Sequence, residues 1–468
     1  MSSPFDEQKY KGLLEGLEIS EVMFSELKIT NYELRLDAEY YRKEFLAHDL
    51  ITKNLIVENL KNVTLKIDVG FVGTMVNHYT KQGVPLLQTK NINEFFVNDG
   101  DTIQITEDFH HQLKKSQINK EDILIARSGS FGKAAIYLET KTVNSSDIII
   151  IKANKAIINP YYLVSFLNTK LGVDQMLRFA SGGLQGHVNL TILERLQVPI
   201  LEDSFQLKIE KILQIAYNAK IQAQTLYHQA EELLLKTIGL KDFKPSQEGT
   251  NIKSFKDSFI STGRLDAEYY QPKYDDYLQL IKNYSDGYEL LQTICHLEDD
   301  NYTPADNQEY KYIELSDVGK SGNLTGCTIA QGRELPTRAR RRVNKNDVII
   351  SSIEGSLESC ALIAKDYDNA LCSTGFYVIN SSKINSETLL VLFKSELMQN
   401  ILKQNCSGTI LTAINKTEFQ NIPIPLIDYT IQQQIAGLIE ESFALRRESE
   451  RLLEEATGMV EREIEKSY

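Results

Sequence analysis

The sequence is poor in the residues that build disulfide or zinc scaffolds, and it lacks any long apolar run. Its five cysteines all lie in the second half and include no C-x-x-C pair: Cys295, Cys327, Cys360, Cys372 and Cys406. Zinc sites use close cysteine pairs, so we expect buried free thiols in a reducing compartment. No apolar run approaches about 18 residues, so we expect no membrane span. The polar start MSSPFDEQKYK lacks a signal-peptide core, which favours a cytoplasmic location.

Length, composition and charge are those of an acidic globular protein with several domains. The chain has 468 residues, of which 42% are hydrophobic and 25% are charged, and this excludes disorder and collagen-like structure. At roughly 100–200 residues per domain, about two to four domains are expected. The formal net charge of −13 argues against a general nucleic-acid coat, because phosphate binding requires lysine and arginine. It is compatible with local basic patches on an acidic body.

An internal repeat determines the predicted architecture. The heptapeptide RLDAEYY at Arg35–Tyr41 recurs unchanged at Arg264–Tyr270, and Asn119–Ile125 is similar to Asn344–Ile350. A period this long indicates a duplicated module of roughly 200 residues rather than a solenoid. Each copy has the same order: the RLDAEYY box, a mixed globular part, a proline-containing exit, and a long helix.

The signals inside each copy predict an α+β module. Apolar strands follow an N-K-x-D turn at Asp122–Ala126 and Asp347–Ser351. We predict two repeated α+β domains joined by two long helices that form an antiparallel coiled coil, in a pseudo-twofold arrangement. The predicted boundaries are 1–30 for an N-terminal extension, 31–202 for domain 1, 203–240 for helix 1, 241–262 for a linker, 263–428 for domain 2 and 429–468 for helix 2.

Two long helices are predicted over residues 205–238 and 431–466, which contain no proline and repeat apolar residues at a three-to-four spacing. Each helix has one heptad row of large residues and one of small residues. The small rows consist of alanine or serine after a first isoleucine: Ile209, Ala216, Ala223 and Ala230, and Ile435, Ser442, Ser449 and Ala456. Small residues allow close approach, so we predict that the helices pair along these rows. The alternative is that each helix only covers its own module.

These features together resemble the specificity (S) subunit of type I restriction-modification systems. The resemblance rests on the duplicated layout, the two RLDAEYY boxes, the strand and turn at Asp122–Gly132, and the long helices. It implies that each globular part is a target recognition domain that reads one half of a split sequence in double-stranded DNA. It also implies that the helices set the gap between the halves and that this chain has no catalytic activity.

The resemblance further implies partners and cofactors. Two DNA adenine methyltransferase subunits would bind symmetrically and use S-adenosylmethionine, and restriction motor-nuclease subunits would use ATP and Mg²⁺. For this chain itself we expect no cofactor, metal or membrane. Domains about one DNA turn apart, roughly 34 Å, would contact the same face of the duplex. The alternatives are a fused methyltransferase or nuclease, and a two-headed protein-binding scaffold with no DNA role.

Two basic segments are the candidate DNA contacts. The densest cluster comprises Arg333, Arg338, Arg340, Arg341, Arg342 and Lys345. Arginine binds guanine or phosphate bidentately, so we predict DNA contact rather than an exposed solvated loop. In the first copy, Arg127, Ser128 and Lys133 lie in a glycine-rich turn that could meet a phosphate or base edge, unless it is a plain β-turn. The second copy lacks this Arg and Lys, which predicts a different target or a different reading loop.

The RLDAEYY box is predicted to be structural or to dock two identical partners. Its candidate partner-binding residues are Asp37, Glu39, Tyr40, Asp266, Glu268 and Tyr269. The carboxylates could cap or pair locally, and the tyrosines could brace each module against the helices. Identity in both copies favours a symmetric role.

One motif resembles a catalytic signature. Asn159-Pro160-Tyr161-Tyr162 is similar to the N-P-P-Y motif of adenine methyltransferases, but it lacks the second proline and an upstream glycine-rich cofactor turn. Its repeat partner begins at Asn385 without the motif. We therefore predict that both asparagines cap helices.

Overall fold

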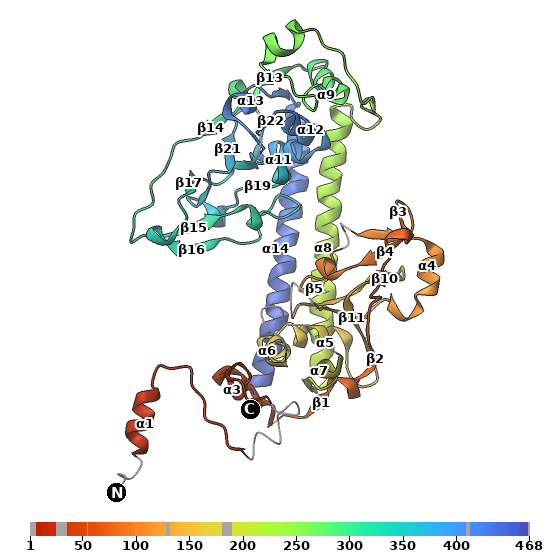
Figure 1. Cartoon of the computed structure of the whole chain (residues 1–468), viewed down its shortest axis with the longest axis vertical. Helices are drawn as coiled ribbons and strands as arrows, with labels where there is room; N and C mark the ends of the chain where they lie inside the picture. Colours follow the sequence, from red (N-terminus) through yellow and green to blue (C-terminus); the bar gives the residue numbers. More distant parts are fainter. Residues whose placement is uncertain are drawn as a thin grey trace. The chain divides into compact units, whose positions relative to one another are not determined.

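The computed structural model of the chain divides into two compact units (Figure 1). Unit 1 comprises Met1–Ala219 and Glu448–Tyr468, and unit 2 comprises Lys220–Arg447. The structure describes residues 6–24, 35–53, 55–98, 100, 102–127, 132–179, 190–408 and 412–466. The described α-helices that lie wholly within unit 1 are α1 (Glu7–Leu14), α3 (Lys43–Lys53), α4 (Glu107–Gln112), α5 (Pro160–Leu167), α6 (Lys170–Phe179) and α7 (Leu190–Glu194).

The strands of unit 1 form two mixed five-stranded sheets and one strand pair within the described residues. The first sheet has the order β3 (Tyr79–Thr80), β6 (Ile103–Ile105), β4 (Val84–Leu87), β10 (Val143–Ser145) and β7 (Gln117–Ile118). The second has the order β2 (Thr64–Val69), β11 (Ile148–Ala153), β8 (Ile123–Ala126), β9 (Ala134–Ile136) and β5 (Phe95–Phe96). The pair consists of β1 (Val57–Asn59) and β12 (Gln197–Pro199).

Unit 2 repeats the two-sheet arrangement of unit 1, but each of its sheets has four strands instead of five. Its helices are α9 (Pro272–Lys282), α10 (Leu291–Ile294), α11 (Ser386–Lys394), α12 (Glu396–Gln404) and α13 (Lys416–Gln420). One sheet has the order β14 (His296–Glu298), β21 (Phe376–Asn380), β18 (Val348–Ser351) and β19 (Cys360–Leu362). The other has the order β16 (Thr328–Gln331), β15 (Glu309–Ile313), β20 (Leu371–Ser373) and β17 (Ala339–Arg342). Two strand pairs complete it: β13 (Tyr288–Leu290) with β24 (Pro423–Pro425), and β22 (Cys406–Ser407) with β23 (Ala413–Ile414).

The pairing of equivalent strands confirms that the chain is a duplicated α+β module. In unit 1, β10 pairs parallel with β4 and antiparallel with β7. In unit 2, β20 pairs parallel with β15 and antiparallel with β17. The N-K-x-D turn also recurs, with a left-handed φ of 70° at Glu121 and 73° at Asn346. In each turn the aspartate carboxylate accepts a backbone N–H from the turn's asparagine, at 2.8 Å in unit 1 and 2.7 Å in unit 2.

Both predicted helix caps are confirmed. The Asn159 side chain accepts the backbone N–H of Tyr161 at the start of α5, where Pro160 occupies the first turn. The Asn385 side chain accepts the backbone N–H of Thr388 at the start of α11. Asparagine at this position satisfies an N–H that the helix leaves unpaired, which accounts for the motif without catalysis.

The two long helices pair along the predicted small rows. They are α8 (Asp203–Thr237) and α14 (Tyr429–Lys466). The Ser449 hydroxyl donates to the Ala216 carbonyl at 2.7 Å in unit 1, and the Ser442 hydroxyl donates to the Ala223 carbonyl at 2.7 Å in unit 2. Residue numbers rise along one helix as they fall along the other, so the pair is antiparallel. Each unit thus contains one half of each helix.

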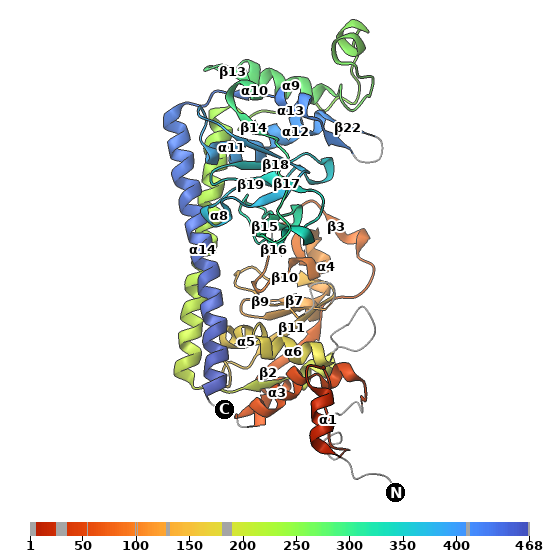
Figure 2. The ribbon, with the colours of Figure 1, turned by 90° about the vertical axis from the view of Figure 1, so that its left-hand side faces the viewer.

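Each globular part shares its hydrophobic core with the halves of α8 and α14 in the same unit. Figure 2 shows α5 and α11 beside these helices in their respective units. Fully buried members in unit 1 include Ile123, Ile149, Tyr162, Ile209 and Val460. Those in unit 2 include Val348, Leu389, Phe393, Ala230 and Ile435. The helices are therefore part of both cores rather than accessories to them.

The cysteines are free thiols, as predicted. Cys295, Cys360, Cys372 and Cys406 are buried, and Cys327 is partly buried. Within the described part of the chain, no three His, Cys, Asp or Glu side chains are arranged to hold a metal ion. None of the helices described there is long and apolar enough to cross a membrane.

Candidate nucleic-acid interface

Half of the basic cluster of unit 2 lies on a strand, and the other half lies in turns. Three of its members, Arg340, Arg341 and Arg342, belong to β17 at the edge of the sheet. Side chains alternate along a strand, and here Arg340 and Arg342 are exposed while Arg341 is only partly exposed. An edge strand has a neighbouring strand on one side only, and here the segment around Tyr302 takes one backbone group of β17, the Arg340 carbonyl.

The exposed arginines are held in place by neighbouring groups. The guanidinium of Arg342 lies over the ring of Tyr302, 5.3 Å from its centroid, and donates to the Asn369 side chain at 2.9 Å. The Arg340 Nε atom donates to the Thr337 carbonyl at 2.8 Å, and the Arg340 carbonyl accepts the backbone N–H of Tyr302. Such contacts reduce the side-chain entropy lost on binding an anion.

Arg341 has a different role from its two neighbours. A register irregularity between Ala339 and Arg341 interrupts the pairing of β17 with β20. Arg341 donates to the Asp299 carbonyl and to the Asn301 side chain, the latter at 3.2 Å. A hydrogen bond from Lys416, aided by Arg341, holds the pKa of Asp299 below its usual range. Arg341 therefore holds residues 299–301 against the sheet through hydrogen bonds.

The other members of the cluster are partly neutralised. Arg338 donates to the carboxylate of Glu314 at 3.0 Å, which raises the pKa of its guanidinium. Arg333 lies 3.8 Å from the carboxylate of Glu334. Lys345 is exposed in the N-K-x-D turn next to β18. Arg340, Arg342 and Lys345 therefore supply most of the positive charge at this edge.

The basic turn of unit 1 is only partly described. The Arg127 guanidinium donates to the Asp147 carboxylate at 3.1 Å, and the Lys133 ammonium lies 3.8 Å from the Glu94 carboxylate. Ser128 lies outside the described residues. The two cations each face a carboxylate, which weakens their attraction for phosphate.

Unit 1 has a second basic segment, which the sequence arguments above missed. Aligning Asn119 with Asn344 places Lys115 opposite Arg340 in the repeat. Lys114 and Lys115 are exposed in the 3₁₀ turn Lys114–Ser116 that leads directly into β7, and the Lys115 ammonium lies 2.9 Å from the Asp68 carboxylate. Since β7 and β17 are equivalent edge strands, both units present cations at the same edge of the same sheet. The repeat alignment itself was the signal that could have identified these lysines.

The RLDAEYY box builds the same local structure twice. The Arg35 guanidinium pairs with both carboxylate oxygens of Asp37, at 2.8 and 2.7 Å, and Arg264 pairs with Asp266 in the same way at 2.8 and 2.6 Å. A hydrogen bond from the arginine lowers the pKa of each aspartate. Tyr40 is buried beneath Arg35, whose guanidinium lies 5.2 Å from its ring centroid.

The remaining carboxylates of the box also have local partners. Glu39 pairs with Arg42 at 3.2 Å and is exposed. Glu268 accepts the Tyr274 hydroxyl at 2.9 Å, and Tyr269 carries the Arg264 guanidinium 4.3 Å from its ring centroid. The structural role is thus visible in both units, and partner binding by the box stays a prediction.

One protein-family model matches this chain twice, once in each half. The sequence matches a family model described as "Type I restriction modification DNA specificity domain" over residues 71–232 and again over 293–454, more than half of the chain. Among curated protein sequences, none matches the chain significantly.

Two solved structures align with most of the chain. The S subunit of a type I restriction-modification system from M. genitalium is 12% identical, with 88% of this chain and 95% of that chain covered and a TM-score of 0.43. The HsdS subunit from Thermoanaerobacter tengcongensis is 13% identical, with 89% and 96% covered and a TM-score of 0.29. The family of this chain is therefore established by the match to the family model and not by these structural alignments, whose TM-scores are low.

Proposed function

Because the chain belongs to the type I restriction modification DNA specificity domain family, we propose that it reads the two halves of a split DNA target. The family supports a DNA-recognition role in a restriction-modification complex, and catalysis there falls to methyltransferase and nuclease partners. The observation that carries the proposal is the presence of cations at the equivalent sheet edge of both units, on β17 in unit 2 and in the turn before β7 in unit 1. Each unit would place this edge along one half of the target.

The proposed contacts differ between the units. In unit 2, Arg340 and Arg342 would bind phosphates or the acceptor atoms of guanine in the major groove. In unit 1, Lys114 and Lys115 would occupy the equivalent place. Arg127 and Lys133 would contribute less, because each faces a carboxylate, that of Asp147 and that of Glu94. Lysine is a point charge and arginine a bidentate fork, so the two edges would read different half-sites.

The long helices would set the gap between the halves and dock the partners. Two adenine methyltransferase subunits carrying S-adenosylmethionine would bind the paired helices and the two boxes, one for each unit. Motor-nuclease subunits using ATP and Mg²⁺ would join that assembly. The duplicated box with identical sequence supports two identical partners, because equal surfaces bind equal subunits.

The salt dependence of DNA binding tests the proposal. Binding of the full chain to a fluorescent duplex would be titrated by anisotropy over a series of salt concentrations. The variant Arg340→Ala with Arg342→Ala should lower the magnitude of the slope of log K against log salt by about 2, because each phosphate contact contributes about 0.9.

A matched control separates contact from net charge. Lys282→Ala with Lys383→Ala removes the same charge from exposed positions elsewhere in unit 2 and should leave the slope unchanged. An equal effect of both double variants, or no effect of the arginine pair, would contradict the proposed interface.

A further inference from the structure

The edge strands β7 and β17 present their side chains in the same alternation. In the repeat, Lys115–Ile118 corresponds to Arg340–Val343. In each run the first and third side chains are at least partly exposed and the fourth is fully buried. The third residues are Gln117, which pairs with β10, and Arg342, which pairs with the equivalent strand β20. Gln117 and Arg342 therefore occupy the same place in the two units.

The side-chain amide of Gln117 has a defined orientation. Its Nε2 atom donates to the backbone carbonyl of His110 at 3.1 Å and lies 3.4 Å from a ring nitrogen of the same residue. A carbonyl oxygen only accepts hydrogen bonds, so the nitrogen end of the amide faces His110. His110 belongs to α4 and is buried, which makes it a fixed neighbour.

The oxygen end of the Gln117 amide is available to a ligand. No described residue donates a hydrogen bond to its Oε1 atom. This atom is also not one of the buried polar atoms without a partner in the described part of the chain, so it is open to solvent. It lies on the edge strand that directly follows the exposed Lys114 and Lys115. The edge of unit 1 thus presents an oriented hydrogen-bond acceptor.

Unit 2 presents hydrogen-bond donors at the equivalent place. The guanidinium of Arg342 lies over the Tyr302 ring and donates to the Asn369 side chain from Nη2. Among the described residues the Arg342 side chain makes no other hydrogen bond, and it is exposed. A guanidinium has five N–H donors and no acceptor, so several donors remain for a ligand. The two copies therefore differ in hydrogen-bonding polarity at one shared position.

The bases differ in the same way in the major groove. Adenine and cytosine present an amino group there, which donates, whereas guanine and thymine present a carbonyl oxygen, which accepts. We propose that Gln117 and Arg342 each determine one base, at equivalent places in the two half-sites. Gln117 Oε1 accepts from the amino group of adenine or cytosine, and Arg342 donates to guanine. This inference rests on the proposed function, because it requires that the two edges lie in the major groove.

The wrong base at either place would leave polar groups unpaired. A guanine beside Gln117 would set its O6 atom against Oε1, two acceptors with no donor between them. An adenine beside Arg342 would set its amino group against the guanidinium, two donors with no acceptor. Unpaired groups excluded from water are unfavourable, so each residue should discriminate between the two kinds of base by roughly tenfold or more.

Exchanging the two residues tests the proposal. Duplexes bound by the full chain would be selected from a random library and sequenced. For the wild type we expect one position with adenine or cytosine in one half-site and one with guanine in the other. Gln117→Arg should turn the first preference toward guanine by about tenfold or more and leave the other half-site unchanged. Arg342→Gln should do the reverse, and thermal unfolding would confirm that each variant is folded.

Two further variants separate base reading from charge. Gln8→Arg adds the same charge at an exposed position of α1 and should change no base preference. Gln117→Ala removes the acceptor without adding charge. It should abolish the preference at its position and leave the slope of log K against log salt unchanged, because phosphate contacts set that slope.

The outcomes also separate this inference from the proposed function. Unchanged base preferences in Gln117→Arg would overturn the inference. Uniformly tighter binding by this variant, with a slope larger by about 1, would also overturn it, because position 117 would then face a phosphate. If Arg340→Ala with Arg342→Ala leaves the salt slope unaltered, the proposed interface itself fails. If that pair lowers the slope while Gln117→Arg changes no preference, only the assignment of bases fails.

Discussion

The paired helices can be lengthened without disturbing their contact. Duplicating Tyr217–Ala223 in α8 and Ser442–Glu448 in α14 adds seven residues to each helix. The small rows repeat every seven residues, so every serine would again face an alanine carbonyl. At about 1.5 Å per residue, the pair would grow by about 10.5 Å. B-DNA rises about 3.4 Å per base pair, so the gap in the target should widen by about three base pairs.

The same insertion changes the helical phase of the DNA. Three base pairs rotate the second half-site by about 100°, since a turn contains about 10.5 base pairs. We therefore expect weaker binding together with the wider gap. Selecting bound duplexes from a library with every gap length, using the complex assembled with its methyltransferase, measures both effects. An unaltered gap would refute the idea that these helices set the spacing.

Two further predictions concern stability. Ser442→Ala and Ser449→Ala each remove a buried hydrogen bond between the helices, and each should lower the free energy of unfolding in urea by about 1 kcal/mol, whereas unchanged midpoints would contradict this. Burial raises the pKa of Asp122, because the charged carboxylate is less stable inside the folded protein than in water. The contribution of Asp122 to the free energy of unfolding is therefore most favourable below pH 3.8 and declines as the pH rises through the folded-state pKa. Asp122→Asn, which can still accept the N–H of Asn119, should therefore gain stability relative to the wild type between pH 4 and 7, and a constant difference would refute this.

Features with local or periodic causes were predictable from the sequence. The N-K-x-D turn needs one left-handed residue and a carboxylate that accepts its own turn's N–H, and both copies contain these elements. The caps at Asn159 and Asn385 follow from the same kind of short-range hydrogen bonding. The helix pairing followed from the heptad spacing of small residues, because that spacing repeats along one face of a helix.

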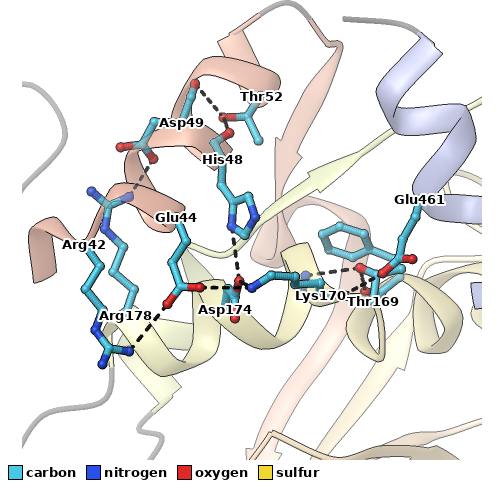
Figure 3. Close-up of polar contacts among 12 residues, drawn as sticks. Arg42, Glu44, His48, Asp49, Thr52, Thr169, Lys170, Asp174, Arg178 and Glu461 are labelled. Atoms are coloured by element: carbon cyan, nitrogen blue, oxygen red, sulfur yellow. Dashed lines mark hydrogen bonds and ion pairs between the residues drawn. The ribbon is translucent and has the colours of Figure 1, made fainter. Parts of the chain in front are cut away.

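Features that depend on distant residues were not predictable in this way. The sequence presents Arg340, Arg341 and Arg342 as equivalent, yet an irregular register on β17 turns Arg341 toward Asp299. The ion pair of Arg178 with Asp49 depends on how α3 and α6 pack (Figure 3), and no spacing rule relates these two positions. Side-chain roles of this kind come from tertiary packing, which overrides local pattern.

The duplication makes each unit a control for the other. Where the two units must do the same thing, the sequence is identical, as in the pairing of Arg35 with Asp37 and its copy in unit 2. Where they differ, they do so on a shared scaffold, since four strands of each sheet follow the same order in both units. The edge cations differ in kind between the units, as two different half-sites would require.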